Sequence, residues 1–556
     1  MSTLVSPAPS TTRYPWGVRG DINAFFGLML DNIGDMILMA ALLVKVFGLP
    51  VDFVLTRMIP GTAIGVMVGD LIYSAMAFRL ARKMGRSDVT AMPLGLDTPS
   101  TFGMVFLILG PAYKAAQGRG LGDSDAATHA WFVGISMIMA SGIFKLICSV
   151  LGPQLRRVVP RAGLLGSLTA ISLVIISFLP LLDIASQPIA GFAALGVVLV
   201  TLTARWELPG QIPGALAAVL VGCLIYYGLW AFGFGPGLGA EGGTPSATLR
   251  ASLPFPAGDW WAWFRLNWGE ASGYLPVALP LALATVIGGI DCTESASAAG
   301  DDYSTGPILA ADAIATLAGG LFGGVIQSTA YIGHPAYKAM GARAGYTLAV
   351  ALFVGAAGIF GFFDWIFYVL PRPVVFPILI FVGLEITSQS FHATPSRYYP
   401  AVTLACVPAL AYLASLALGQ VLPETGKPFE QLGAQTQQWV QTVTMLAGGF
   451  IVTSLIWSTT LSHLIDGKIR PAVCTLLVAA ACSLFGVIHS GLPSGPLITP
   501  GEAIRRLKVE GRYEASIRQT PYHWAAAYAT VAAILLVIGS VGRAPSVEAA
   551  DEPRPI

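Results

Sequence analysis

Long apolar runs follow one another along almost the whole chain, separated by short breaks rich in polar residues, glycine or proline. A helix needs about 20 apolar residues to cross a hydrocarbon core of roughly 30 Å, and most of the runs approach that length. Continuous runs favour helices, because a membrane barrel would show short segments of alternating polarity. We predict spans near 22–46, 56–80, 91–112, 131–151, 163–183, 188–204, 212–234, 273–298, 307–326, 328–340, 344–363, 366–387, 400–419, 439–461, 471–489 and 523–541.

The composition strengthens the prediction of an integral membrane protein. Of 556 residues, 55% are hydrophobic and 11% are charged, and the mean hydropathy is +0.70. A net charge of +1 gives no reason to expect nucleic acid as a partner. The six cysteines are scattered, with no CxxC pair or Cys/His cluster, so we expect no metal and no cofactor.

Basic loops predict the orientation in the membrane. The sequences "RLARKMGR" and "QLRRVVPR" follow the second and fourth spans and place the N-terminal segment 1–20 in the cytoplasm, at a cell's inner (plasma) membrane. The basic loop 490–521 would then be external if every late segment crosses, which conflicts with the same rule. We therefore expect one late segment to be miscounted or incompletely inserted.

The two halves of the chain resemble one another. The sequence "PGTAIGVMVGDLIY" lies over "AADAIATLAGGLFG", and "ASGIF" lies over "AAGIF", in the same order. A duplication of seven spans would insert its second copy with the opposite orientation, which is typical of secondary transporters. We predict repeats at 21–234 and 272–461, an external loop with a tryptophan anchor at 235–271, and extra helices and a tail at 462–556.

Two spans, one in each half, are interrupted by polar residues and proline. They read "TAMPLGLDTPSTFGM" (90–104) and "QSTAYIGHPAY" (327–337), and superposing their prolines places Asp97 on Gly333 and Thr98 on His334. Irregular backbone at membrane depth is tolerated where protein covers it or where it lines a wet cavity. We predict that the two breaks meet and that these four residues contribute to a polar pocket.

Carboxylates within apolar segments are the second group of candidates. Asp291 and Glu294 are three residues apart, on one face of a helix, and Ser295 is four residues from Asp291. We predict that they bind the solute and that both acids take part in proton coupling. In the first span Asp31 and Asp35 also share a face, and they either coordinate a cation or relay a proton, or they support the pocket from behind.

Five other polar residues receive structural interpretations. Asp301, Asp302 and Asp312 lie near the ends of predicted spans and are expected at the membrane interface. Lys145 and His489 are lone polar residues in apolar segments and are interpreted as structural.

The run "ESASAAGDDYSTGPILAADAIATLAGGLFGG", followed by "QSTAYIGHPAY" and preceded in the first half by "TAMPLGLDTPS", resembles the nucleobase/ascorbate transporter family, the xanthine/uracil permeases. The resemblance covers about residues 20–420. It implies an all-α polytopic membrane protein with fourteen core spans in two inverted seven-span repeats, divided into core and gate domains. The third and tenth spans would be interrupted at the substrate, and this chain adds extra C-terminal helices.

The same resemblance assigns roles to particular residues. The family's substrate-binding acid on the eighth span matches Asp291, while its second acid, on the tenth span, is replaced here by Gly333. Phe25, Phe102 and Tyr331 are candidates to stack on a flat ring.

These features predict a secondary active transporter, not an enzyme, that carries a small planar solute of the nucleobase type by proton symport, with Na⁺ as the alternative ion. An anion or small-carboxylate transporter of the same fold is the alternative, because sulfate, bicarbonate and dicarboxylate transporters share this architecture. A channel is a more distant alternative. The expected partners are the solute, protons and the lipid bilayer, and a homodimer is left open.

We expect Asp291→Asn and Glu294→Gln each to abolish or severely reduce solute uptake while leaving expression unchanged, because each removes a carboxylate that accepts hydrogen bonds from the solute. Uptake into proteoliposomes is the measurement. Wild-type rates in both variants would remove the two acids from the mechanism.

Overall fold

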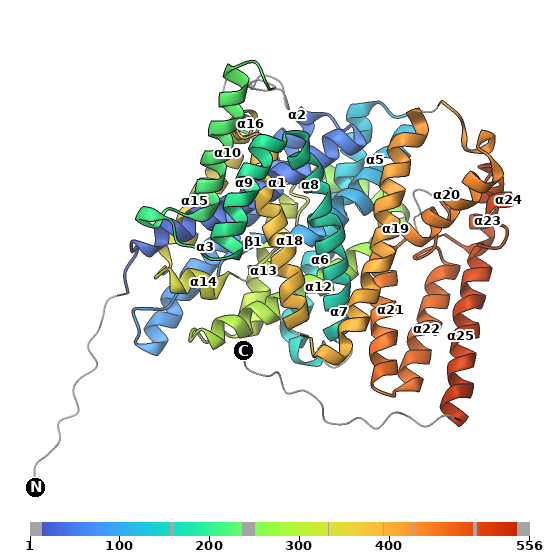
Figure 1. Ribbon diagram of the computed structural model, residues 1–556. Helices are drawn as coiled ribbons and strands as arrows, with labels where there is room; N and C mark the ends of the chain where they lie inside the picture. The colour runs from blue at the N-terminus through green and yellow to red at the C-terminus, as the bar shows by residue number, and fades with distance from the viewer. Residues whose placement is uncertain are drawn as a thin grey trace, which may run out of the picture.

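The computed structural model describes residues 14–155, 161–235, 251–331, 333–392, 394–424, 426–492 and 498–541. Three predicted regions therefore lie in part outside the described residues: the N-terminal segment at 1–13, the external loop at 236–250 and the tail at 542–556. The described chain is a bundle of helices around a single two-stranded sheet (Figure 1).

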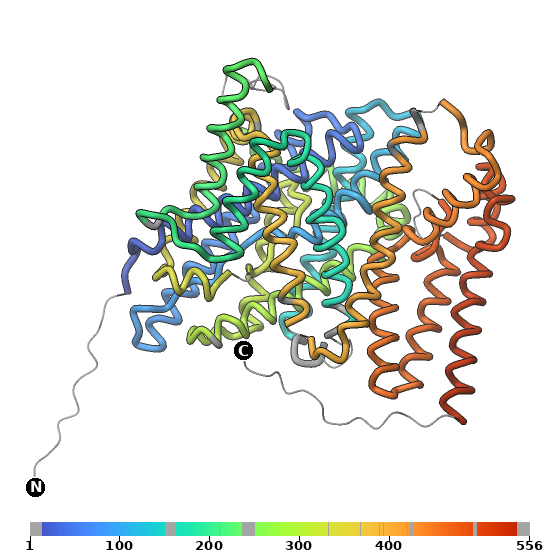
Figure 2. The backbone as a smooth tube through the Cα atoms, viewed as in Figure 1, coloured from blue at the N-terminus to red at the C-terminus, as the bar shows by residue number. Residues whose placement is uncertain are grey.

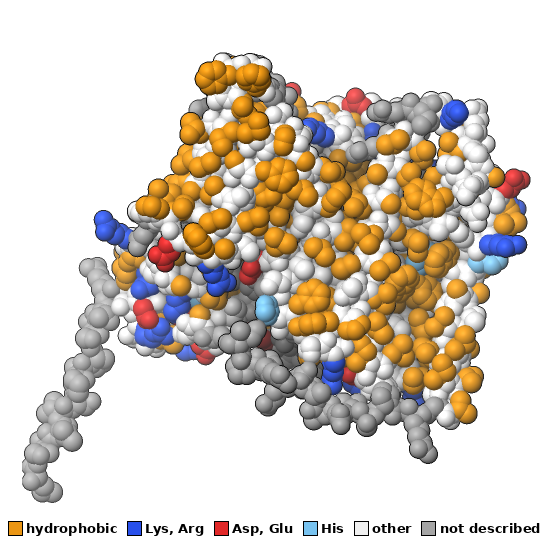
Figure 3. Space-filling view, viewed as in Figure 1, with side chains coloured by type: hydrophobic (Ala, Val, Ile, Leu, Met, Phe, Trp, Pro, Cys, Tyr) orange, Lys and Arg blue, Asp and Glu red, His pale blue; other side chains and the backbone are white. Residues whose placement is uncertain are grey.

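The predicted spans are present as helices. Within the described residues, nine helices are long and apolar enough to cross a membrane, and a bent pair forms a tenth candidate. Four shorter apolar helices, at 188–203, 305–321, 345–359 and 469–484, and the two interrupted segments account for the remaining predictions. Hydrophobic side chains spread over the face seen in Figure 3, with charged residues gathered toward its margins. The protein is thus a multi-pass membrane protein.

The second half of the chain repeats the order of elements in the first half, as the tube in Figure 2 allows the reader to follow. The first half contains α1 (Gly20–Phe47), α3 (Ile59–Met84), β1 (Leu94–Leu96), α4 (Thr98–Gly103), α5 (Gly110–Gly118), α6 (Asp123–Leu155), α7 (Arg161–Ala170), α8 (Phe178–Ser186), α9 (Pro188–Val198) and α10 (Gly214–Ala231). The second contains α12 (Leu275–Ala298), α13 (Thr305–Leu321), β2 (Ser328–Ala330), α14 (His334–Ala339), α15 (Gly345–Ile359), α17 (Arg372–Val375), α18 (Pro377–His392), α19 (Tyr399–Glu424), α20 (Ala434–Ala447) and α21 (Phe450–Ile465).

Helix contacts separate these elements into two groups. The core group contains α1, α3, α6, α12, α13 and α15 with the strands, and the gate group contains α7 to α10, α17 to α19 and α21. Each group draws helices from both halves of the chain, and the two strands run antiparallel. This arrangement confirms the predicted architecture of two inverted repeats divided into core and gate.

The gate group is extended by helices that the repeat does not require. Helices α22 (Ile469–Leu484) and α25 (Pro521–Val541) pack on each other and on α21, at the right of Figure 1. Helices α20 and α21 meet at an angle of 70° at Gly448–Gly449. The amphipathic helix α11 (Ala257–Ser272) carries the predicted tryptophan anchor ahead of α12.

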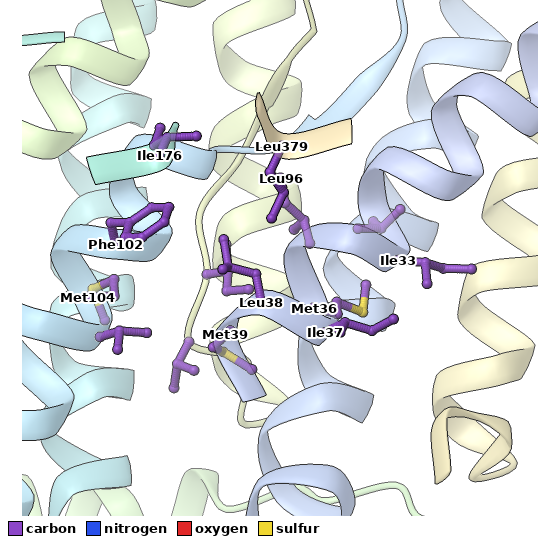
Figure 4. Packing of buried hydrophobic residues seen from close by; sticks show 14 of the residues in the cluster. Ile33, Met36, Ile37, Leu38, Met39, Leu96, Phe102, Met104, Ile176 and Leu379 are labelled. Carbon is purple, nitrogen blue, oxygen red and sulfur yellow. The ribbon is translucent and has the colours of Figure 1, made fainter. Parts of the chain in front are cut away.

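Helix α1 passes through the middle of the molecule. Figure 4 shows its side chains Ile33, Met36 and Ile37 packed near Leu96 of β1 and Leu379 of α18. All five side chains are almost completely buried. Helix α1 therefore connects the strands to the gate group.

Small residues let the core helices approach the strands and each other. Gly61 of α3 lies so close to the chain after α13 that a Cβ atom at this position would be 2.2 Å from the backbone nitrogen of Gly324. Backbone atoms cannot rotate away as a side chain can, so the contact between α3 and α13 requires glycine here.

We expect Gly61→Ala to lower the thermal stability of the purified protein, with a cost of about 1–3 kcal/mol for overpacking. The matched control is Gly228→Ala on α10, where an added Cβ meets nothing within 4 Å. Melting of both variants in the same detergent is the measurement, and equal melting temperatures would contradict the tight contact.

Candidate functional site

The two interrupted segments meet, as predicted, and they meet as paired strands. β1 and β2 are antiparallel with Gly95 opposite Thr329. The pairing continues beyond the strands, because Tyr331 N–H donates to Pro93 C=O (2.8 Å) and Asp97 N–H donates to Gln327 C=O (2.9 Å). Extended backbone from both repeats therefore crosses inside the helical bundle.

Side chains close the free edge of β1. The Asn32 amide of α1 donates to Leu94 C=O (3.2 Å) and accepts from Leu96 N–H (3.1 Å), as a neighbouring strand would. Asp70 of α3 accepts from Leu94 N–H (3.2 Å). Unpaired backbone groups cost several kcal/mol in lipid, so these two buried side chains are what make the strand tolerable at this depth.

The free edge of β2 is closed in the same way from the second repeat. Asp312 of α13 accepts from Ala330 N–H (3.1 Å), and Thr316 accepts from Ser328 N–H (3.2 Å). Lys145 of α6 donates to Ser328 C=O (2.5 Å) and to the Thr316 hydroxyl (3.2 Å). Asp312 is completely buried and also bonds the Tyr73 hydroxyl, so the interfacial position expected for it is wrong.

Asp97 and Gly333 hold equivalent positions before the short helices that follow the two breaks, as predicted. Asp97 caps α4, where its Oδ2 accepts from Ser100 N–H (3.0 Å) and from the Thr285 hydroxyl (3.1 Å). Gly333 holds the same position before α14 but offers no side chain. A Cβ on Gly333 would lie 2.6 Å from the Tyr331 ring, so the acid that the family carries here could not enter unless that ring moved.

Asp31 and Asp35 lie beside the strand crossing. Both are nearly or fully buried, and Asp35 accepts from the Thr98 hydroxyl at the start of α4 (2.9 Å). The Oδ2 atom of Asp31 lies 3.7 Å from where a Cβ of Gly95 would be, and Tyr331 contacts the same point. Asp31 therefore borders the face of the sheet formed by Gly95, Thr329 and Tyr331, and Asp35 lies at the start of the adjoining helix α4.

Several polar atoms around this crossing lack hydrogen-bond partners within the described part of the chain. They include the second carboxylate oxygens of Asp35 and Asp70, both amide atoms of Gln327 and Nδ1 of His334, and all four side chains are completely buried. Native proteins leave few buried polar groups unpaired, and such groups concentrate where water, an ion or a ligand binds.

The α12 candidates lie further from the interior than the strands do. Asp291 and Ser295 are half-buried, while Glu294 is exposed. The adjacent Cys292 contacts Ala330 C=O of β2 through its thiol (3.3 Å), which fixes this helix against the second strand. Of the predicted acids on α12, Asp291 is the one that lies nearer the buried side of the helix.

His334 is engaged by residues of the core. Its Nε2 lies 3.2 Å from Thr90 C=O and 3.3 Å from Asp301 Oδ2, and it is completely buried. Asp301 also pairs with Lys338 Nζ (2.5 Å) and is itself buried within the protein, in the connection between α12 and α13. Burial alone would raise the pKa of Asp301, but the His334 and Lys338 side chains outweigh it and hold that pKa below its usual range.

Two of the three aromatic candidates pack in other places. Phe25 makes edge contacts with Phe353 of α15, and Phe102 stacks on Phe106. Tyr331 alone of the three borders the strand face.

Four polar residues at the crossing were not predicted as part of the site: Asn32, Asp70, Gln327 and Lys145. Each is a polar residue within an apolar segment, which is a signal the sequence does contain.

No protein-family model and no curated protein matches the sequence. Three solved structures are similar in shape. The transmembrane domain of a cyanobacterium bicarbonate transporter, BicA, is 14% identical with a TM-score of 0.45, over 68% of this chain and 90% of that one. SLC26A9 is 13% identical with a TM-score of 0.46, over 71% of this chain and 61% of that one. The murine anion transporter Slc26a9 in its inward-facing state is 14% identical with a TM-score of 0.48, over 74% of this chain and 69% of that one. At these values nothing about the solute follows from the likeness.

We expect Asn32→Leu to destabilise the protein strongly, because it leaves Leu94 C=O and Leu96 N–H without partners, at about 1–3 kcal/mol for each group. Asn23→Leu is the control on the same helix, since the side chain of Asn23 makes no hydrogen bond in the part of the chain that the structure describes. Thermal unfolding followed by intrinsic fluorescence compares the two, and equal stability would show that Asn32 does not hold β1.

Proposed function

We propose that the protein is a secondary transporter that moves a small polar solute by alternating access, with the strand crossing as the solute site. The observation that carries this proposal is the set of buried polar groups without partners around the crossing, above all Gln327 and the second oxygen of Asp35. A solute that bonds these atoms would satisfy groups that otherwise remain unpaired. Displacement of the core group against the gate group would then expose the site to each side in turn.

Asp31 and Asp35 are proposed to bind the coupling ion. They are one turn apart on α1, both are buried, and no basic side chain pairs with either of them in the described residues. Two negative charges this close in a medium of low dielectric constant repel each other strongly. A proton shared by the pair relieves that repulsion, and Na⁺ bound between the carboxylates is the alternative.

A nucleobase-like solute is one candidate cargo. Its N–H groups would donate to Asp97 and Asp291, its carbonyl groups would accept from the Gln327 amide, and its ring would lie against Tyr331. In this assignment Asp97 takes the place of the tenth-span acid that the family resemblance implies, because Gly333 supplies no carboxylate.

A small anion is the second candidate, and the specific observation in its favour is Lys145. This buried cation sits at the outer edge of β2, where its positive charge offsets those of Asp97 and Asp312. The structural neighbours named above for bicarbonate and anion transport have TM-scores that are too low to decide between the two cargoes.

The test of coupling uses Asp31→Asn and Asp35→Asn in proteoliposomes, with Asp302→Asn as the control because Asp302 is exposed. We expect the rate of gradient-driven uptake to fall at least about tenfold in each α1 variant, which corresponds to a barrier higher by about 1.4 kcal/mol. Each variant should retain solute exchange across the membrane. Exchange needs the moving site but no net ion transfer. Normal gradient-driven uptake in both variants would contradict the assignment.

The cargo is identified by thermal-shift binding with uracil and xanthine in one series and bicarbonate, sulfate and small dicarboxylates in the other. Gln327→Leu should weaken the affinity for the true ligand by up to about tenfold, since one hydrogen-bonding amide is worth about 0.5–1.5 kcal/mol. A ligand whose binding is unaffected by this substitution does not occupy the strand face.

A further inference from the structure

Helix α11 is the last part of the connection that runs from the gate group to the core group. The connection leaves α10, reaches α12 and is attached to the core group first at Ser252. The Ser252 backbone N–H donates to Ile359 C=O (2.7 Å), and its hydroxyl donates to Thr56 C=O (2.7 Å). After this point α11 packs on α6. Whatever holds α11 on α6 therefore also holds the start of α12.

A cluster of three side chains, Glu270, His129 and Arg119, joins α11 to the start of α6. Glu270 lies in the last turn of α11, His129 in the second turn of α6, and Arg119 directly follows α5. Arg119 donates to both carboxylate oxygens of Glu270, at 2.9 and 3.2 Å. The Trp263 ring meets the His129 ring edge-on, with 5.2 Å between the centroids. This contact fixes the position of the imidazole beside the carboxylate.

A single ring nitrogen of His129 faces two groups of opposite character. Its Nε2 atom lies 2.9 Å from Arg119 Nη2 and 2.9 Å from Glu270 Oε1. A guanidinium can only donate a hydrogen bond, and an ionised carboxylate can only accept one. Nε2 without a proton therefore bonds Arg119, and Nε2 with a proton bonds Glu270. The position of one proton thus decides the partner of His129.

His129 is the member of this cluster whose charge changes near neutral pH. Hydrogen bonds from His129 and Arg119 outweigh burial and lower the pKa of Glu270 to about 2, so its carboxylate is ionised and its contribution constant at about pH 5 to 8. Histidine is the side chain type that ordinarily titrates in this range. The elements packed here carry other ionisable side chains of different types, which are Tyr113 and Lys114 on α5, Asp123 and Asp125 on α6, Asp259 and Arg265 on α11, and Tyr274.

Protonation shifts the balance toward Glu270. A neutral ring carries its proton on either nitrogen and so divides its time between the two partners, whereas the imidazolium donates from Nε2 to Glu270. That hydrogen bond is charge-assisted and about twice as strong as a neutral one. The imidazolium also repels Arg119, which is 47% exposed and can turn into water, while His129 is 10% exposed and stays against Glu270.

We propose that His129 is a pH sensor whose protonation fastens α11 to α6 through Glu270, and whose deprotonation loosens α11 because the ring then also bonds Arg119. The orientation predicted from the basic loops places this contact on the external side of the membrane. Acid on that side would restrain the connection between the gate and core groups and the start of α12. The sensing itself does not depend on the proposed transport function.

Hydrogen exchange tests this proposal on the full-length protein in nanodiscs, by mass spectrometry of α11 peptides at about pH 5.5 and about pH 7.5, corrected for the intrinsic pH dependence of exchange. We expect the protection of amides 263–272 to be about fivefold greater in acid, since a hydrogen bond to a charged group is the stronger one. His129→Gln and Glu270→Gln should each remove this difference. His523→Gln, at an exposed histidine on α25, should leave it unchanged.

His129→Lys adds an arm that a damaged fold cannot imitate. A permanent cation should raise the protection of α11 at about pH 7.5 to the level of the wild type in acid, whereas misfolding would lower it. Arg119→Gln should keep the pH dependence, because the pair between His129 and Glu270 remains. Equal protection of the wild type at both pH values, or a difference that survives His129→Gln, would overturn the proposal. These measurements need no solute, so a failed transport assay leaves them untouched.

Discussion

The structure depends on hydrogen bonds that close the two edges of a short antiparallel sheet within a membrane bundle. Strands leave N–H and C=O groups unpaired on both outer edges, and no water is available in lipid to satisfy them. Asn32 and Asp70 satisfy the edge of β1, and Asp312, Thr316 and Lys145 satisfy the edge of β2. Buried polar side chains, which would otherwise destabilise a membrane protein, thus stabilise its irregular backbone by hydrogen bonding to it.

This constraint explains where the unpaired chemistry lies. The edge residues hold the backbone, and among them the second carboxylate oxygen of Asp70 also lacks a partner within the described residues. Asp31, Asp35 and Gln327 lie beside the same strands, and the second oxygen of Asp35 and the Gln327 amide keep polar atoms unpaired within the described residues. The crossing therefore contains side chains that hold the strands and side chains that keep buried, unpaired polar atoms beside them.

Much of the fold could be predicted from sequence because its signals are local. Apolar runs of sufficient length located the spans, and proline with polar residues located both breaks. The equivalence of Asp97 and Gly333 followed from aligning the prolines, and both residues do precede the first turn of a half-helix. The meeting of the two breaks followed from a physical argument, that irregular backbone needs cover.

The details of the site could not be predicted, because spacing along a helix does not fix which way the shared face points. Asp291 and Glu294 share a face, yet one is half-buried and the other exposed. His334 has the sequence context of a ligand-binding residue, but Asp301, from a loop 33 residues earlier, lies against its Nε2, and only Nδ1 is left without a partner within the described residues. Asn32 and Lys145 are visible in the sequence as polar residues in apolar segments, but their role of holding the strands depends on residues that are distant in sequence, so the local pattern does not reveal that role.

The pairing of the strands is tested most directly by disulfide cross-linking of Leu96→Cys with Ser328→Cys in a background without the six natural cysteines. These positions face each other in the register, at a separation of about 4.5 Å between Cα atoms expected for such a pair, within the range a disulfide spans. The account predicts rapid cross-linking of this pair and little for Leu94→Cys with Ser328→Cys, which is out of register. Absent cross-linking, or faster cross-linking of the second pair, would contradict it.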